Sequence, residues 1–133
     1  MTTHAAATFE VKKWDEKPYH EVEGELKLTR ASVHKAFHGD LEGESTLEYV
    51  MAYPAKATTS FVGIEHFTGR LGGHSGSFVI QHTGTDDGHT STGRWHVLPG
   101  SGTSGLKGLR AEGEFLATRN EPAFGFNMDY DFG

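Results

Sequence analysis

The stretch from Gly63 to Gly84, GIEHFTGRLGGHSGSFVIQHTG, carries the clearest fold signal in this chain. Apolar and polar residues alternate in both halves of the stretch, and the sequence Leu71-Gly72-Gly73-His74 separates the halves. A period of two is typical of β-strands, and glycines between two such runs favour a tight turn. The stretch therefore predicts a hairpin of two antiparallel strands that reverses at Gly72-Gly73.

The turn sets which residues of the two strands are opposed. A two-residue turn, or a four-residue loop from Leu71 to His74, places Glu65 opposite Ile80 and Phe67 opposite Phe78, whereas a three-residue turn would exchange the faces. One face then holds Phe61, Gly63, Glu65, Phe67, Gly69, Gly76, Phe78, Ile80, His82 and Gly84. The other face holds Val62, Ile64, His66, Thr68, Ser75, Ser77, Val79, Gln81 and Thr83. We assign the first face, with its large rings and glycines, to the interior.

Glu65 and His82 become diagonal neighbours on this apolar face. A buried acid needs a partner, because an unpaired buried charge is costly. Two interpretations remain open. The pair satisfies its own hydrogen bonds and stabilises the fold, or it is the polar anchor or acid/base pair of an internal cavity.

Other segments of the chain show the same alternation. We expect further strands at residues 6–14, 21–37, 41–52, 89–98, 108–117 and 124–132, with a polar connection at 15–19 and a loose end at 1–5. A helix over 26–37 is the alternative for the second segment, but its β-branched residues favour a strand. Short strands between turn signals predict an all-β protein, a single antiparallel β-barrel of about eight strands spanning residues 1–133.

An Asp87-Gly88 turn after the central hairpin would place Trp95 opposite Ile80 and Val97 opposite Phe78. Trp95 would then join the interior face. If the barrel holds a cavity, the candidate lining residues are Glu65, His82, Phe67, Phe78, Ile80, Trp95 and Tyr49. No residue is assigned a catalytic role.

The composition disfavours several kinds of chemistry and several classes of binding partner. The chain has 133 residues, no cysteine and a net charge of -6, which disfavours disulfides, thiol chemistry and binding to nucleic acid. No apolar run is long enough to span a membrane as a helix, and the start does not resemble a secretion signal, so we expect a cytoplasmic protein. Val62, Ile64 and Val79 on the outer face predict a homo-oligomer.

Two further patterns resemble functional motifs. Residues 100–105 fit G-x-G-x-x-G, but Gly108 and Gly113 argue against the helix that a phosphate loop requires, so we expect a turn-rich connection. Nine histidines suggest a metal, yet His66 and His82 fall on opposite faces and His74 lies in the turn. We therefore predict neither a metal site nor a cofactor.

Three segments resemble a known bacterial family. They are GRLGGHSGSFVIQHTG (69–84), VLPGSGTSGLKGLRAEG (97–113) and HGDLEGESTLEYVMAY (38–53), and they are similar to single-domain proteins known as domain of unknown function 3224. The resemblance covers nearly the whole chain. It implies a barrel similar to that of allene oxide cyclases and plant dirigent proteins, and it implies no established activity or catalytic residues.

Three functions follow as hypotheses. The barrel interior binds a small, largely apolar molecule, since a barrel of this size can hold one small ligand. Alternatively, the same cavity confines an apolar substrate for a cofactor-free isomerisation or cyclisation. In the third hypothesis the barrel is fully packed and serves as a structural or interaction module.

Overall fold

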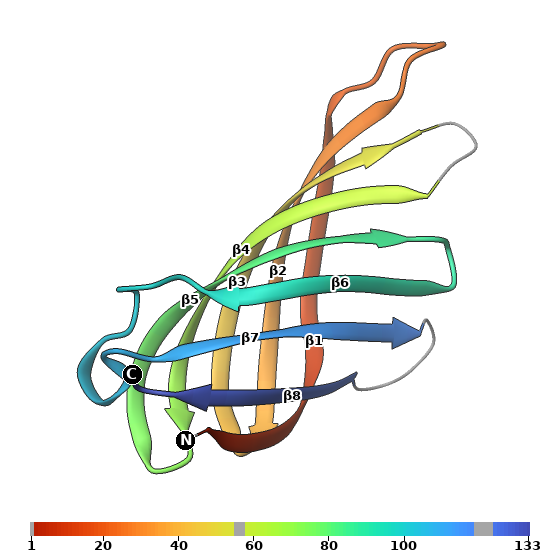
Figure 1. Cartoon of the computed structure of the whole chain (residues 1–133). Helices are drawn as coiled ribbons and strands as arrows, with labels where there is room; N and C mark the ends of the chain where they lie inside the picture. Colours follow the sequence, from red (N-terminus) through yellow and green to blue (C-terminus); the bar gives the residue numbers. More distant parts are fainter. Residues whose placement is uncertain (1, 55–57, 119–123) are drawn as a thin grey trace.

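The computed structural model describes residues 2–54, 58–118 and 124–133. Eight antiparallel strands form a closed barrel in the order β1-β2-β3-β4-β5-β6-β7-β8 (Figure 1). The strands are β1 (Thr3–His20), β2 (Lys27–Gly39), β3 (Leu41–Tyr53), β4 (Thr59–Leu71), β5 (His74–Asp86), β6 (Thr90–Val97), β7 (Arg110–Thr118) and β8 (Phe124–Asp131), with one 3-10 turn, η1 (Ser104–Leu106). The predicted all-β, single antiparallel barrel is confirmed. Within these residue ranges, no helix is long and apolar enough to cross a membrane.

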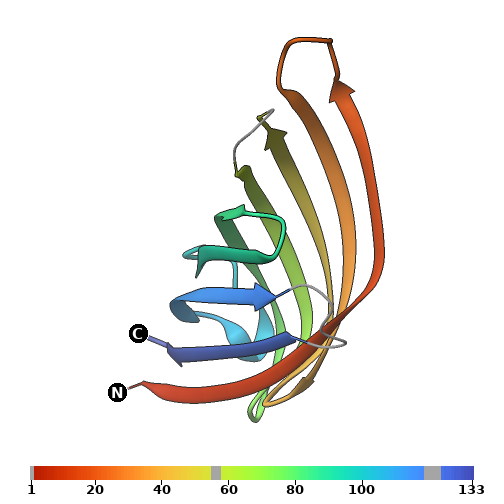
Figure 2. The same cartoon turned by 90° about the vertical axis from the view of Figure 1, so that its right-hand side faces the viewer.

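The strands on one side of the barrel, β1 to β4, are longer than β6 to β8. The hairpin of β1 and β2 projects well beyond the shorter strands β6 to β8, and the ends of β3 and β4 follow it (Figures 1 and 2). The barrel closes where the first part of β1 pairs with β8, from Thr3 opposite Tyr130 to Phe9 opposite Phe124. Both termini therefore lie at the same end of the molecule (Figure 2).

The central hairpin has the predicted register. Leu71 lies opposite His74 across Gly72-Gly73, Phe67 lies opposite Phe78, and Glu65 lies opposite Ile80. The face assigned to the interior is buried or half-buried throughout, whereas Val62 and Ile64 on the other face are 52% and 46% exposed. The period of two therefore identified the inner and outer faces of β4 and β5.

The predicted register between β5 and β6 is wrong by two residues. His82 lies opposite Trp95, and Ile80 lies opposite Val97. The turn centres on Gly88-His89 because the Asp87 carboxylate accepts hydrogen bonds from the backbone N–H groups of His89 and Thr90, both at 2.8 Å. An aspartate that bonds its own backbone in this way starts a turn instead of occupying its middle. A shift of two residues leaves every side chain of β6 on the same face of the sheet, so Trp95 still points into the barrel.

β1 is longer than predicted at both ends. The expected connection at 15–19 is strand, with Pro18 paired to Thr29, and the expected loose end contributes Thr3 to Ala5 to the sheet. Proline is tolerated at the edge of a sheet, because an edge strand has a row of N–H groups without partners. β8 pairs with β1 only up to Phe9, so Pro18 lies where β1 is an edge. The turn between β1 and β2 falls at 21–26, which had been expected to be strand.

The barrel core contains two apolar clusters. The larger surrounds Phe37, Phe67 and Phe78 and includes Leu106 and Leu109 from the connection after β6, which packs against this end of the barrel. The smaller cluster consists of Ala31, Val33, Leu47, Tyr49, Met51 and Phe61. The connection is held to β5 by Thr103, whose backbone N–H donates to the carbonyl of Ser77 at 2.9 Å. Residues 100–105 thus form the predicted turn-rich connection.

Candidate functional site

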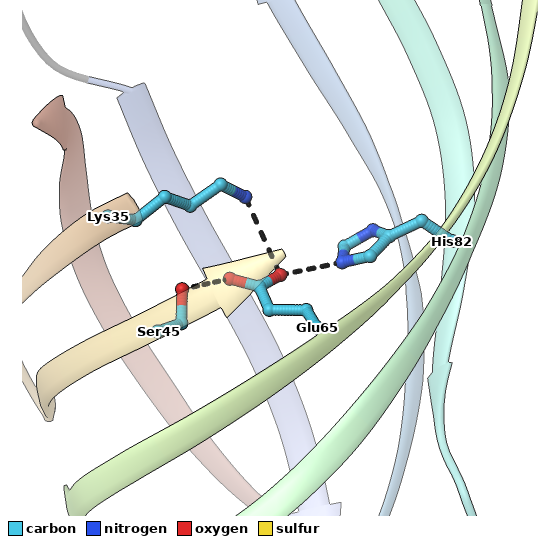
Figure 3. A network of polar contacts seen from close by, with 4 residues as sticks. All are labelled: Lys35, Ser45, Glu65 and His82. Atoms are coloured by element: carbon cyan, nitrogen blue, oxygen red, sulfur yellow. Dashed lines mark hydrogen bonds and ion pairs between the residues drawn. The ribbon is translucent and has the colours of Figure 1, made fainter. Parts of the chain in front are cut away.

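A cluster of four polar side chains lies inside the barrel. Lys35, Ser45, Glu65 and His82 come from four successive strands, β2 to β5, and converge on the Glu65 carboxylate (Figure 3). Nε2 of His82 lies 2.7 Å from Oε1 of Glu65, Nζ of Lys35 lies 3.5 Å from the same oxygen, and the Ser45 hydroxyl donates to Oε2 at 2.5 Å. All four residues are buried, and Glu65 is only 1% exposed.

The strand registers explain why these side chains meet. Glu65 lies opposite Leu47 on β3 and Ile80 on β5, so Ser45 and His82 are its diagonal neighbours on the inner face. Such neighbours are within reach of long side chains. The predicted proximity of Glu65 and His82 is therefore confirmed as a direct hydrogen bond.

Charge and hydrogen bonds keep the Glu65 carboxylate ionised. Burial by itself raises the pKa of this group, because it disfavours the charged form. The positive charge of Lys35 and the hydrogen bonds from His82 and Ser45 outweigh burial and hold the pKa of Glu65 well below its ordinary value of 4.5. The cluster thus holds a carboxylate that accepts hydrogen bonds at neutral pH.

The contact with Glu65 determines where the His82 ring carries a proton. An ionised carboxylate can only accept, so Nε2 of His82 must be the donor in the 2.7 Å contact. The other ring nitrogen, Nδ1, points away from Glu65 (Figure 3). It is buried and has no hydrogen-bond partner among the residues that the structure describes, and the same is true of Nε1 of Trp95.

A cavity of about 170 Å³ lies next to the polar cluster. Its walls are mostly aromatic and aliphatic, and they are formed by Phe9, Val11, Trp14, Val33, Lys35, Tyr49, Met51, Phe61, His82, Asp86, Ser91, Trp95, Phe115, Ala117, Phe124 and Phe126. Val11 and Trp14 are 39% and 46% exposed, which places the mouth of the cavity beside β1. Lys35 and His82 are the members of the polar cluster that line it.

The predicted cavity residues fall into two groups. Tyr49, His82 and Trp95 line the cavity. Phe67, Phe78 and Ile80 pack in the larger apolar cluster instead, where the rings of Phe67 and Phe78 lie 5.0 Å apart, and Glu65 lies behind Lys35 and His82. The interior is therefore packed on one side of the polar cluster and hollow on the other.

Sequence reasoning missed two members of the polar cluster. Lys35 has the same parity as Val33 and Phe37, so the alternation along β2 carried a signal that it points inward. However, a lysine usually lies on the solvent-facing side of a strand because it is charged, so Lys35 was not predicted to be buried. Ser45 shares a face with Leu47 and Tyr49, but a serine is small enough for either face.

A second hydrogen-bond network lies near the mouth of the cavity. The Glu16 carboxylate accepts from the Trp14 indole at 3.0 Å, from the Thr29 hydroxyl at 2.6 Å and from the Tyr53 hydroxyl. Burial, and then the hydrogen bond to Glu16, raise the pKa of Tyr53 to about 12. The hydrogen bond to Glu16 holds the Trp14 ring at the mouth of the cavity, where its centre lies 5.9 Å from that of the Tyr49 ring.

The histidines and carboxylates were compared with the arrangements that bind metals. Among the residues that it describes, no group of three or more His, Cys, Asp or Glu side chains is arranged to hold a metal ion. His66 is exposed on the outer face of β4 and His82 is buried, as the register predicted. The side chains of Lys35, Glu65 and His82 can donate, accept and transfer protons at this site.

Comparisons with known proteins agree with this architecture. The sequence matches the family described as "Protein of unknown function (DUF3224)" over residues 5–130. The crystal structure of a protein of unknown function from the DUF3224 family of Shewanella oneidensis MR-1 is similar, with a TM-score of 0.79 and 28% sequence identity. That match covers 100% of this chain and 99% of the other. A comparison with curated proteins found no match. This chain therefore belongs to the DUF3224 family.

Proposed function

We propose that this protein binds one small, largely apolar molecule in the interior of its barrel. The observation that carries the proposal is the cavity of about 170 Å³, whose apolar walls are interrupted by Lys35 and His82. Apolar cavities of about 150 Å³ bind molecules of the size of benzene. Few polar groups on an apolar wall are typical of ligand sites, because they orient a ligand that burial holds.

The size of the cavity supports binding over a fully packed barrel. Each enclosed water needs roughly 10–15 Å³ of such volume, so the space exceeds that of a few waters. The rings around it are also well supported. Phe115 and Tyr49 contact the His82 ring edge-on, with centroids 6.2 and 6.4 Å away. A ligand with one ring would meet walls that are already ordered.

Toluene is a suitable first probe. We expect toluene to raise the melting temperature of the wild-type protein by a few degrees, because a ligand at ten times its Kd stabilises the folded state by about 1.4 kcal/mol. Ala117→Phe should abolish the effect, since Ala117 lines the cavity. Leu116→Phe is the matched control, because Leu116 is the preceding residue and is exposed on the outer face. An equal toluene response in both variants, or none in the wild type, would refute the proposal.

Catalysis of an isomerisation or cyclisation is a second candidate. The observation in its favour is the hydrogen bond between Glu65 and His82, which orients an imidazole that lines the cavity. A histidine held in this way can take a proton from a substrate, while the carboxylate stabilises the imidazolium that forms. Once a ligand is known, retained binding with lost turnover in Glu65→Gln would favour this function.

A further inference from the structure

The polar cluster defines what kind of ligand the cavity would accept. This step rests on the proposed function and starts from charge balance inside the barrel. Glu65 carries one negative charge, and Lys35 supplies one positive charge 3.5 Å away. A protonated His82 would give the cluster two cations around one carboxylate, an excess of charge that is costly in an apolar interior. Asp86, an acidic residue that lines the cavity, accepts hydrogen bonds from the Gly88 N–H and the Ser91 hydroxyl. The cluster is electrically neutral when His82 is neutral.

A neutral His82 presents a hydrogen-bond acceptor. Its proton is on Nε2, where it is donated to Glu65, so Nδ1 retains a lone pair. Nδ1 has no hydrogen-bond partner among the described residues, although the His82 ring lines the cavity. An unsatisfied buried acceptor is destabilising, and a ligand that supplies a donor would recover part of that free energy.

The charge of Lys35 limits which hydrogen-bond donor a ligand can present to His82. Its ammonium group lines the same cavity and lies 4.4 Å from the centre of the Phe9 ring. A ligand ammonium group beside His82 would bring a second cation next to Lys35, so the donor that meets Nδ1 of His82 is uncharged. The walls are largely aromatic, with Tyr49, Phe61 and Phe115 around His82, and the volume suits a single ring.

We infer that the cavity takes a small hydroxylated aromatic molecule, whose hydroxyl group donates a hydrogen bond to Nδ1 of His82. Glu65 is a positioning residue in this arrangement, because it sets the tautomer of His82 without lining the cavity. Trp95 has a different role. Its indole nitrogen faces β7, where a Cβ at Gly113 would lie 3.2 Å from Nε1, so its ring serves as a wall.

Four probes of similar size test the inference on the full chain: phenol, toluene, anisole and benzoate. Nitrogen-15 spectra of the histidine side chains report directly on the tautomer, and the His82→Gln spectrum identifies the His82 signals. We expect His82 to carry its proton on Nε2. Phenol should shift the Nδ1 signal, whereas toluene and anisole, which lack a donor, should leave it nearly unchanged.

Affinities provide a second test. Replacing His82 with Phe should lower the affinity for phenol relative to toluene by roughly threefold to tenfold, the value of one neutral hydrogen bond. His66→Phe is the matched control, since His66 is exposed on the outer face of β4, and it should leave the ratio unchanged. If His82→Phe does not fold, the spectra of the wild-type protein still decide.

The outcomes separate this inference from the proposed function. Binding of toluene without any phenol-specific shift at Nδ1 would overturn the hydroxyl contact and leave apolar binding intact. Tighter binding of benzoate than of phenol would also overturn it, in favour of an anion attracted by Lys35. If none of the four probes binds, both the inference and the proposed function fail.

Discussion

Glu65 is the residue on which the polar interior depends. Its carboxylate receives hydrogen bonds from Ser45 and His82 and the charge of Lys35, so every neighbour favours the ionised form. Breaking such a buried arrangement by removing one partner leaves an uncompensated charge and typically costs 3–5 kcal/mol. The same residue sets the His82 tautomer, so stability and ligand recognition are coupled at one carboxylate.

The lowered pKa of Glu65 predicts acid sensitivity with a definite sign. The pKa of the carboxyl is lower in the folded state than its ordinary value of 4.5, so the unfolded chain binds more protons as the pH falls through 4.5. The stabilisation is present above pH 4.5 and is lost as the pH falls through the lowered pKa of the folded state. The difference in unfolding free energy between wild type and Glu65→Gln should therefore shrink from pH 5 to pH 2.5.

Urea denaturation at several pH values measures this difference. Glu44→Gln is the control, because Glu44 is an exposed carboxylate on β3. Its unfolding free energy should follow that of the wild type at every pH. A difference between wild type and Glu65→Gln that stays constant down to pH 2.5 would contradict the assigned ionisation of Glu65.

At the scale of elements, two opposed glycines allow β3 and β4 to pack closely. Gly43 pairs with Gly69, and the tip of the Phe67 ring lies over both. A Cβ at Gly69 would lie 2.2 Å from the backbone carbonyl oxygen of Glu42 and 2.9 Å from the Phe67 ring. Backbone atoms cannot move aside as a flexible side chain can, so the strand requires glycine here.

We therefore expect Gly69→Ala to destabilise the barrel by roughly 1–3 kcal/mol, the usual cost of overpacking. Gly73→Ala is the matched control, because it lies in the adjacent turn and a Cβ there meets nothing within 4 Å. Thermal unfolding of both variants gives the comparison. Equal melting temperatures for the two variants would show that the close approach of β3 and β4 does not constrain the fold.

At the scale of the whole molecule, the outer surface of β3 and β4 carries an exposed apolar patch of Val50, Val62 and Ile64. Val50 and Val62 are directly opposed, and Arg30 and Glu48 line the same shallow groove. A two-fold arrangement would bring the apolar patches of two copies together, with the opposite charges of Arg30 and Glu48 at their border. Val79, which was expected in this patch, is half-buried instead, and its backbone bonds Ser101 and Leu98.

We propose that this patch contacts a second copy of the chain. Light scattering at micromolar concentration should give twice the mass of one chain, and Ile64→Lys should give the mass of a monomer with an unchanged circular dichroism spectrum. Thr68→Lys is the control, because Thr68 lies on the same face of β4 outside the groove. A monomeric mass for the wild type would rule out this contact.

Much of the fold could be predicted from local sequence. The Gly72-Gly73 turn and the period of two specified the register of β4 and β5, and therefore which side chains point inward. The proximity of Glu65 and His82 could be predicted from the sequence because it follows from this register. The register of β5 and β6 was wrong because a single side chain, that of Asp87, moved the turn by one residue.

Local alternation was enough to predict the all-β class, and the turn of one hairpin was enough to predict the inner face of β4 and β5 and the pair of Glu65 and His82. The folded barrel adds that Lys35 and Ser45 complete the cluster, that β1 closes on β8, and that space remains beside His82. The β1–β8 closure joins the two ends of the chain, and the cluster and the cavity depend on how side chains from several strands pack together. No local period records how four strands aim their side chains at one carboxylate, or how much volume their rings leave unfilled.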